Sequence, residues 1–410
     1  MARSGSILGN AVRRKEDPGV LRGETQYFDD LHFDHLAHVV FVRSLFAHAR
    51  LESIDTSAAR EMPGVLGVYT ADDLNLPDQQ GFAMLPPVFN RPPLARGTVR
   101  FVGDVVVAVV AETRTQAVDA AEQVIVDYDP LPVVVDAEAA LADGAPLVFP
   151  DHGSNLAFEL NFGTDPTVFD GADVVVEQTF QNQRVAGVPM EGNGIVAVPG
   201  TPELTAWVPT QGPNGLQAPL ATALGLDAAA VRIVAPAVGG GFGPKAGLYV
   251  EHIVTSKIAL VLQRPVKWTE TRSENMVSMV HGRGQVQLVE LGLKRDGTIV
   301  GLRATAIADA GGYPAIGAFL PFFTRTMAQG VYRIPKIEFT VRSVATNTTP
   351  TGAYRGAGRP EATALLERIL DIAADELGID AAEIRRRNFL QPSEFPLTTV
   401  TGANYDNGEY

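Results

Sequence analysis

Two glycine-rich loops hold the residues of this sequence whose types and spacing best suit ligand binding. The first, residues 239–243, reads GGGFG and is followed by Lys245. The second, residues 352–358, reads GAYRGAG and contains Arg355. Glycine leaves backbone N–H groups open to the close approach of an anion, and each basic side chain adds a positive charge beside its loop. Together the loops predict a site for an extended ligand that carries phosphate.

The first loop also fits a dinucleotide-binding pattern. Residues 241–246, GFGPKA, match the form G-x-G-x-x-A, and Glu270 could supply the acid that binds a ribose hydroxyl. Against this pattern, Glu270 lies about 29 residues after Gly241, where about 20 is usual. Pro244 inside the loop is a second departure. An NAD-type oxidoreductase stays an alternative, as does a loop that needs glycine for its own shape.

Both loops are predicted to connect a strand to a helix. Runs of β-branched residues predict strands over 231–238 and 337–346, just before the two loops. Apolar residues at helical spacing follow each loop, and the second helix is predicted to begin near Pro360. The amino end of a helix carries about half a positive charge, so this arrangement would strengthen anion binding at both loops.

Composition and charge argue against several classes of function. The 410 residues carry a net charge of −14, which argues against general binding to nucleic acid or to an anionic membrane. The sequence has no cysteine, so this chain alone builds no disulfide, zinc–thiolate site or iron–sulfur cluster. No apolar stretch follows Arg13 and Arg14, and no apolar run approaches the ~20 residues of a membrane span. We therefore expect a cytoplasmic location.

Eight stretches of the sequence occur in a characteristic order. Among them are QRVAGVPMEGNG (183–194), PTQGP (209–213), VGGGFGPK (238–245) and PTGAYRGAGRPEA (350–362). In this order they resemble the large subunit of the molybdenum hydroxylases, the family of xanthine dehydrogenase and aldehyde oxidase. The resemblance extends over nearly the whole sequence.

The resemblance implies an α+β fold built from two folded regions. An N-terminal segment, residues 1–19, would precede an α/β hammerhead domain over residues 20–135. A linker over residues 136–160 would lead to the first half of a molybdopterin-binding domain, residues 161–410. The C-terminal half of that domain would then be a partner of this chain.

The resemblance further implies that the glycine loops hold a molybdenum-molybdopterin cofactor in its cytosine dinucleotide form. Three residues would lie near the metal: Gln211, Phe242 through its backbone N–H, and Arg355. The implied cofactor-binding residues are Gln211, Gly240, Gly241, Phe242, Gly243, Arg355 and Gly356. No catalytic residue is assigned in this chain, because the family's general-base glutamate lies in the C-terminal half of the domain.

The implied activity is the hydroxylation of an aldehyde or of an N-heteroaromatic carbon, with water as the oxygen source. Electrons would leave through partner subunits that carry 2Fe-2S clusters and FAD. The chain by itself is expected to be inactive, because the site would need the other half of its domain. A non-catalytic assembly module of a multi-subunit dehydrogenase is a further alternative.

Three positions depart from the family pattern. Ala246 stands where purine-oxidising members carry a substrate-binding glutamate, and Ala357 stands where they carry an aromatic residue. The second loop, AYRGAGR, also lacks the cysteine of molybdenum carbon monoxide dehydrogenase. These departures argue against xanthine and carbon monoxide as substrates.

Overall fold

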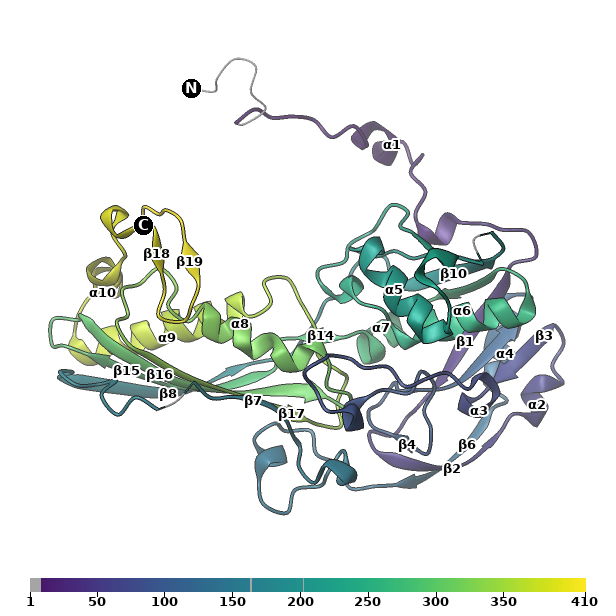
Figure 1. The fold of residues 1–410 in the computed structure, drawn as a ribbon, viewed down its shortest axis with the longest axis horizontal. Helices are drawn as coiled ribbons and strands as arrows, with labels where there is room; N and C mark the ends of the chain where they lie inside the picture. The colour runs from purple at the N-terminus through teal and green to yellow at the C-terminus, as the bar shows by residue number, and fades with distance from the viewer. Residues whose placement is uncertain (1–8, 163, 202) are drawn as a thin grey trace.

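The computed structural model describes residues 9–410 except residues 163 and 202. The first eight residues of the predicted N-terminal segment, 1–19, therefore lie outside the described residues. Two large β-sheets with helices on their faces form the body, one in each half of the view in Figure 1. An N-terminal arm that carries α1 (Asp17–Leu21) extends away from this body.

The first sheet has seven strands and mixes parallel with antiparallel pairs. In spatial order the strands are β12 (Val231–Val234), β11 (Leu204–Trp207), β10 (Gly194–Pro199), β13 (Val266–Thr269), β1 (Ala37–Arg43), β5 (Val105–Ala111) and β3 (Val65–Tyr69). Every residue of β5, VVVAVVA, is buried, as expected of an apolar, mostly β-branched run inside a sheet. The helices packed against this sheet are α4 (Arg114–Ala121), α5 (Pro213–Leu224) and α6 (Val250–Leu262).

This sheet joins two regions that the sequence predicts to be separate domains. Strands β1, β3 and β5 come from residues 20–135, whereas β10, β11, β12 and β13 come from residues 161–410. Strand β1 pairs in parallel with β13, with Ala37 opposite Val266. The rings of Phe41 and Trp268, one from each region, pack in a T-shaped arrangement with their centroids 5.7 Å apart. The two regions therefore share one apolar core.

The second sheet has five strands and lies in the other half of the molecule (Figure 1). In spatial order the strands are β7 (Leu156–Leu160), β17 (Ile337–Ala345), β16 (Ile299–Gly311), β15 (Gln285–Leu293) and β8 (Val174–Asn182). Helices α8 (Leu320–Thr326) and α9 (Arg359–Leu377) pack on it, and α10 (Ala381–Asn388) packs on α9. Strand β7 falls inside the predicted linker 136–160, so the end of that segment belongs to the sheet.

Shorter elements complete the fold. A three-stranded sheet contains β4 (Thr98–Val99), β2 (Ala49–Asp55) and β6 (Ile125–Pro130), and two-stranded pairs join β9 (Val185–Ala186) to β14 (His281–Gly282) and β18 (Leu397–Thr398) to β19 (Asn404–Tyr405). The short helices are α2 (Ser57–Arg60), α3 (Ala71–Leu74) and α7 (Arg272–Ser278). Within the described residues, no helix is long and apolar enough to cross a membrane.

Candidate functional site at the two glycine loops

The first glycine loop follows β12 and presents three successive backbone N–H groups. Those of Gly240, Gly241 and Phe242 donate to no other residue in the described part of the chain. The φ angles are 99° at Gly240, 55° at Phe242 and 106° at Gly243. A Cβ atom at Gly241 would lie 2.5 Å from Oε1 of Gln211. Successive N–H groups on such a backbone form a concave site for an anion.

The elements around this loop differ from the prediction. The strand predicted over 231–238 ends at Val234, two residues before Pro236, which has no N–H to donate to a neighbouring strand. One 3-10 turn follows the loop, and α6 begins at Val250, because the backbone at Gly247 is extended. The predicted helix amino end is therefore not at the loop. The loop's own amides supply its positive potential.

The elements around the second loop agree with the prediction. Strand β17 ends at Ala345, against a predicted end at residue 346, and α9 begins one residue before Pro360. Gly358, with φ of 91°, precedes the helix. The helix amino end therefore does lie beside this loop, where it favours a negative charge.

The two loops are in direct contact. The backbone N–H of Arg355 donates to the carbonyl oxygen of Phe242 at 2.8 Å. A Cβ atom at Gly243 would lie 2.4 Å from the carbonyl oxygen of Ala353, so this approach requires glycine. The structure thus brings together Phe242, Gly243 and Arg355, with Gly240, Gly241 and Gly356 in the same two loops.

Gln211 lies against the first loop, between β11 and α5. Its Oε1 accepts from the N–H of Gly243 at 2.7 Å, and its own N–H donates to the carbonyl oxygen of Lys245 at 3.0 Å. Gln211, Phe242 and Arg355 are all exposed, and Phe242 keeps 42% of its surface accessible. The predicted site residues therefore gather at one place on the surface.

Lys245 does not add a charge to that surface. Its side chain is fully buried, and Nζ donates to Oε2 of Glu191 at 2.9 Å. Burial lowers the pKa of Lys245, and the bond to Glu191 opposes that shift. The sequence predicts a positive charge of Lys245 beside the loop; in the structure this side chain lies beneath the loop and is paired with Glu191, so it presents no free charge to a ligand. Glu191, in the turn PMEGN, had no predicted role, because neither its burial nor its partner can be read from the sequence.

Strained backbone gathers around these loops. Four non-glycine residues with positive φ lie here: Val188 (39°), Phe242 (55°), Arg283 (64°) and Ala357 (38°). The neighbour of Val188, Gly187, lies close to the first loop, since a Cβ there would be 2.7 Å from Pro244. Such conformations cost on the order of 1–3 kcal/mol each and are typical of functional sites.

Arg283 holds the second loop in place. It donates to the carbonyl oxygens of Tyr354 at 3.2 Å and Arg355 at 2.7 Å, and its guanidinium group lies 4.8 Å from the centre of the Tyr354 ring. Its charge is balanced by buried Glu361 at 3.4 Å. With its donors bound to the backbone, Arg283 fixes the loop from which the Arg355 side chain extends.

A cavity of about 530 Å³ opens beside both loops. Its described lining is mostly apolar and includes Gly243, Ala246, Leu248, Tyr313, Ile316, Gly352 and Ala353. The one charged residue among its described lining residues, Arg91, is already paired with Asp104 at 3.2 Å. Cavities of this size hold a small organic molecule, and this lining favours one without net charge.

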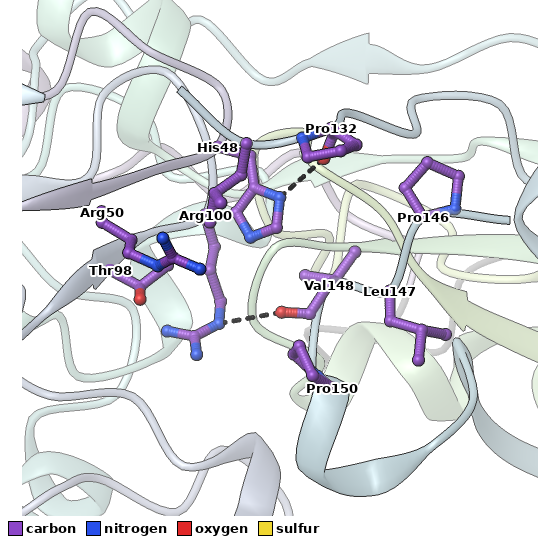
Figure 2. Close-up of a pocket in the computed structure, with 10 residues that line it drawn as sticks. His48, Arg50, Thr98, Arg100, Pro132, Pro146, Leu147, Val148 and Pro150 are labelled. Carbon is purple, nitrogen blue, oxygen red and sulfur yellow. Dashed lines mark hydrogen bonds between the residues drawn. The ribbon is translucent and has the colours of Figure 1, made fainter. Parts of the chain in front are cut away.

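A second cavity, of about 240 Å³, lies away from the loops (Figure 2). Nδ1 of His48 donates to the carbonyl oxygen of Pro132 at 2.8 Å, and Nε of Arg100 donates to that of Val148 at 3.2 Å. These bonds join the residue before β2 and the residue after β4 to the segment after β6. None of the predicted site residues lines this cavity.

Comparison with known proteins decides the family. Residues 22–132 match the model "Aldehyde oxidase and xanthine dehydrogenase, a/b hammerhead domain". Residues 148–389, more than half of the chain, match the model "Molybdopterin cofactor-binding domain". The chain belongs to the molybdenum hydroxylase family. Its fold is accordingly a hammerhead domain followed by a molybdenum-cofactor-binding domain, in an α+β architecture.

Relatives cover nearly all of this chain. It is 35% identical to the nicotine 6-hydroxylase large subunit of Paenarthrobacter nicotinovorans, over 99% of this chain and 51% of that protein. It is 37% identical to the carbon monoxide dehydrogenase large chain of Hydrogenophaga pseudoflava, over 100% of this chain and 54% of that protein. The structure of quinoline 2-oxidoreductase from Pseudomonas putida 86 matches with a TM-score of 0.93 and 34% identity, over 98% of this chain and 52% of that chain. The chain thus spans about half the length of these molybdenum hydroxylases.

The dinucleotide alternative loses its support. The seven-stranded sheet is mixed, whereas a dinucleotide-binding fold uses a mostly parallel doubly wound sheet. Glu270 is buried, and its Oε2 accepts from the N–H of Asn193 at 2.8 Å and from Nδ2 of Asn275 at 2.7 Å. It therefore does not face the first loop as a ribose-binding acid would.

Proposed function

We propose that this chain forms the face of a molybdenum hydroxylase that holds the molybdopterin cofactor, in its cytosine dinucleotide form. The three unengaged N–H groups of the first loop carry this proposal. A Cβ atom at Gly241 would overlap the Gln211 side chain, so glycine is needed to keep that side chain beside these N–H groups. The N–H groups have no partner among the described residues and suit a bulky ligand with anionic oxygen and sulfur atoms. Within the described residues, no group of three His, Asp or Glu side chains could hold a metal ion. A metal ion that brings its own organic ligand fits this site.

The exposed polar groups of the loops have distinct roles in this proposal. Oε1 of Gln211 is bound to Gly243, so its Nε2 is left to donate toward the metal centre. The N–H of Phe242 and the guanidinium group of Arg355 would donate to the same region. Preorganised donors of this kind stabilise negative charge that develops during reaction. The cofactor supplies the redox chemistry when it is bound.

The substrate in this proposal is an aldehyde or an N-heteroaromatic compound, hydroxylated with oxygen from water. The apolar cavity beside Gly243 and Ala246 supports an uncharged ring or short chain. Ala246 provides no carboxylate for a purine. Two of the relatives are named for nicotine and for quinoline, which both contain an N-heteroaromatic ring.

The proposed enzyme is a complex. The C-terminal half of the molybdopterin-binding domain would complete the site and supply the general base, and subunits with FAD and 2Fe-2S clusters would accept the electrons. We place the complex in the cytoplasm. We expect that this chain expressed alone binds little cofactor and oxidises no substrate.

The test uses the assembled complex with Gln211→Ala and Arg355→Ala. Because each variant removes a donor from the metal centre, turnover should fall about 100-fold, while subunit assembly stays intact by size-exclusion chromatography. Exposed Arg386→Ala, on α10, is the control. Full turnover in both site variants contradicts the assignment. A wild-type complex with neither molybdenum nor turnover indicates an assembly module, and NAD(H) affinity without molybdenum indicates the dinucleotide alternative.

A further inference from the structure

A buried ion pair lies beneath the first glycine loop. The Lys245 side chain is 0% exposed and that of Glu191 is 14% exposed. Oε2 of Glu191 accepts from Nζ of Lys245 at 2.9 Å and from the N–H of Gly239 at 2.8 Å, and Oε1 accepts from the N–H of Phe28 at 3.3 Å. The N–H of Glu191 donates back to the carbonyl oxygen of Gly239 at 3.1 Å. Glu191 therefore holds the first residue of the loop through both its side chain and its backbone.

Lys245 holds the other end of the same loop through its backbone. Its carbonyl oxygen accepts from the N–H of Gln211 at 3.0 Å and from Oγ1 of Thr210 at 2.9 Å. Oε1 of Gln211 in turn accepts from the N–H of Gly243 at 2.7 Å. The contacts form a closed ring that runs from Glu191 to Gly239, along the loop to Gly243, and through Gln211 and Lys245 back to Glu191.

The charge of Lys245 depends on this ring. A buried ammonium group is unfavourable unless a carboxylate pairs with it. Among the described residues, Glu191 is the carboxylate within 4 Å of Nζ. Glu270 and Arg272 also act on the charge of Lys245, but from a longer distance. Loss of either partner therefore removes the contact that closes the ring and leaves the other charge without its partner.

We propose that Glu191 and Lys245 are positioning residues, which fix the shape of the first glycine loop and the place of Gln211 without touching the ligand. This inference rests on the proposed function, and it adds two residues behind the binding surface. The ring sets the direction of the N–H groups of Gly240, Gly241 and Phe242. When the ring opens, these donors no longer converge, and a ligand that needs all of them binds in the wrong place.

The first measurement follows backbone hydrogen exchange in the full chain, which requires no cofactor. Lys245→Met keeps the length of the side chain and removes its charge, so the amides of Gly239 and Gly243 should exchange about tenfold faster or more. Glu191→Ala should raise both exchange rates by a similar factor. Glu191→Gln should raise them by a smaller factor, because its amide oxygen still accepts a hydrogen bond from the N–H of Gly239. The matched control is Lys267→Met: Lys267 is 6% exposed and lies 2.8 Å from Asp29 in the same half of the fold. It should leave both amides unchanged.

The second measurement uses the assembled complex. Lys245→Met should lower the molybdenum content or, where the metal is retained, should lower kcat about tenfold with KM within about twofold. The electron paramagnetic resonance signal of the one-electron-reduced metal, Mo(V), should broaden, because the altered loop would hold the cofactor in several positions. Lys267→Met should match the wild type in all three readouts.

The inference is overturned if Lys245→Met, Glu191→Ala and Lys267→Met show the same amide exchange rates and the same molybdenum content. If Lys245→Met does not fold, the double variant Glu191→Gln/Lys245→Met removes both charges at nearly constant volume, and unchanged exchange at Gly239 and Gly243 in it contradicts the role. A wild-type complex without molybdenum would contradict the proposed function instead, and the exchange data would still decide the role of the ring.

Discussion

Glu270 is a buried carboxyl group behind the first glycine loop, directly after β13. Burial raises its pKa to about 7, although the hydrogen bonds from Asn193 and Asn275 act in the opposite direction. Because the folded-state pKa is above the unfolded value, the group stabilises the fold at acid pH. That contribution is present in full below the unfolded pKa and is lost as the pH rises through about 7.

We predict that Glu270→Gln removes this pH dependence. The amide is neutral and keeps an acceptor for Asn193 and Asn275, so the variant should gain about 1–3 kcal/mol of stability relative to the wild type between about pH 5 and about pH 8. Urea unfolding across this range measures the difference. Glu122→Gln, at an exposed carboxylate, is the control and should follow the wild type. A constant difference between Glu270→Gln and the wild type at every pH would contradict the prediction.

The sequence was informative about residues that face outward and uninformative about those beneath them. The two glycine loops pointed to Gly241 and Arg355, and the family resemblance added Gln211; the structure brings these residues together. The same motif misplaced Lys245, because a basic residue after a glycine loop is equally compatible with a surface charge and a buried ion pair. Glu191, its partner, is 54 residues away in the chain. A contact of that range leaves no local pattern in one sequence.

At the scale of the elements, the close approach of the two loops depends on Gly243. We predict that Gly243→Ala drives the loops apart, because its Cβ would lie 2.4 Å from the carbonyl oxygen of Ala353 and its φ is 106°. The strained backbone alone should cost about 1–2 kcal/mol of unfolding free energy, and the overlap should break the bond between Phe242 and Arg355. Thermal unfolding and the exchange rate of the Arg355 amide measure both effects.

Gly247→Ala is the matched control for this prediction. A Cβ atom at Gly247 would meet nothing within 4 Å, and its φ is −106°. We expect its stability to stay within about 0.5 kcal/mol of the wild type. If Gly243→Ala unfolds at the same temperature as Gly247→Ala and protects the Arg355 amide equally, the loops do not need glycine at that contact.

Element boundaries were predictable where one pattern dominated. The apolar spacing of α9 and its stop at Gly378, with φ of 64°, gave that helix nearly its full length. Strand β12 and helix α6 differed from the prediction because Pro236 and Gly247 interrupt patterns that otherwise continue. Strand β7 was missed inside the segment 136–160, because five residues among turn-forming neighbours carry little periodicity, and its pairing with β17 is long-range.

At the scale of the molecule, the seven-stranded sheet makes the hammerhead region dependent on the rest of the chain. We predict that residues 20–135 expressed alone aggregate, because the edge of β1 that pairs with β13, including Ala37 and Val39, becomes exposed. Co-expression with residues 136–410 should restore a soluble assembly with one thermal transition. Light scattering and co-purification measure this outcome. A monodisperse, folded 20–135 fragment would show that β1 needs no partner.

The two loops are rooted in different sheets: the first follows β12 of the seven-stranded sheet and the second follows β17 of the five-stranded sheet. The hydrogen bond between Phe242 and Arg355 therefore also connects the half of the molecule built on the seven-stranded sheet to the half built on the five-stranded sheet. We expect that a subunit which shifts one sheet relative to the other changes the distance between the two loops. The affinity for a ligand bound between the two loops would then respond to a contact made far from the site.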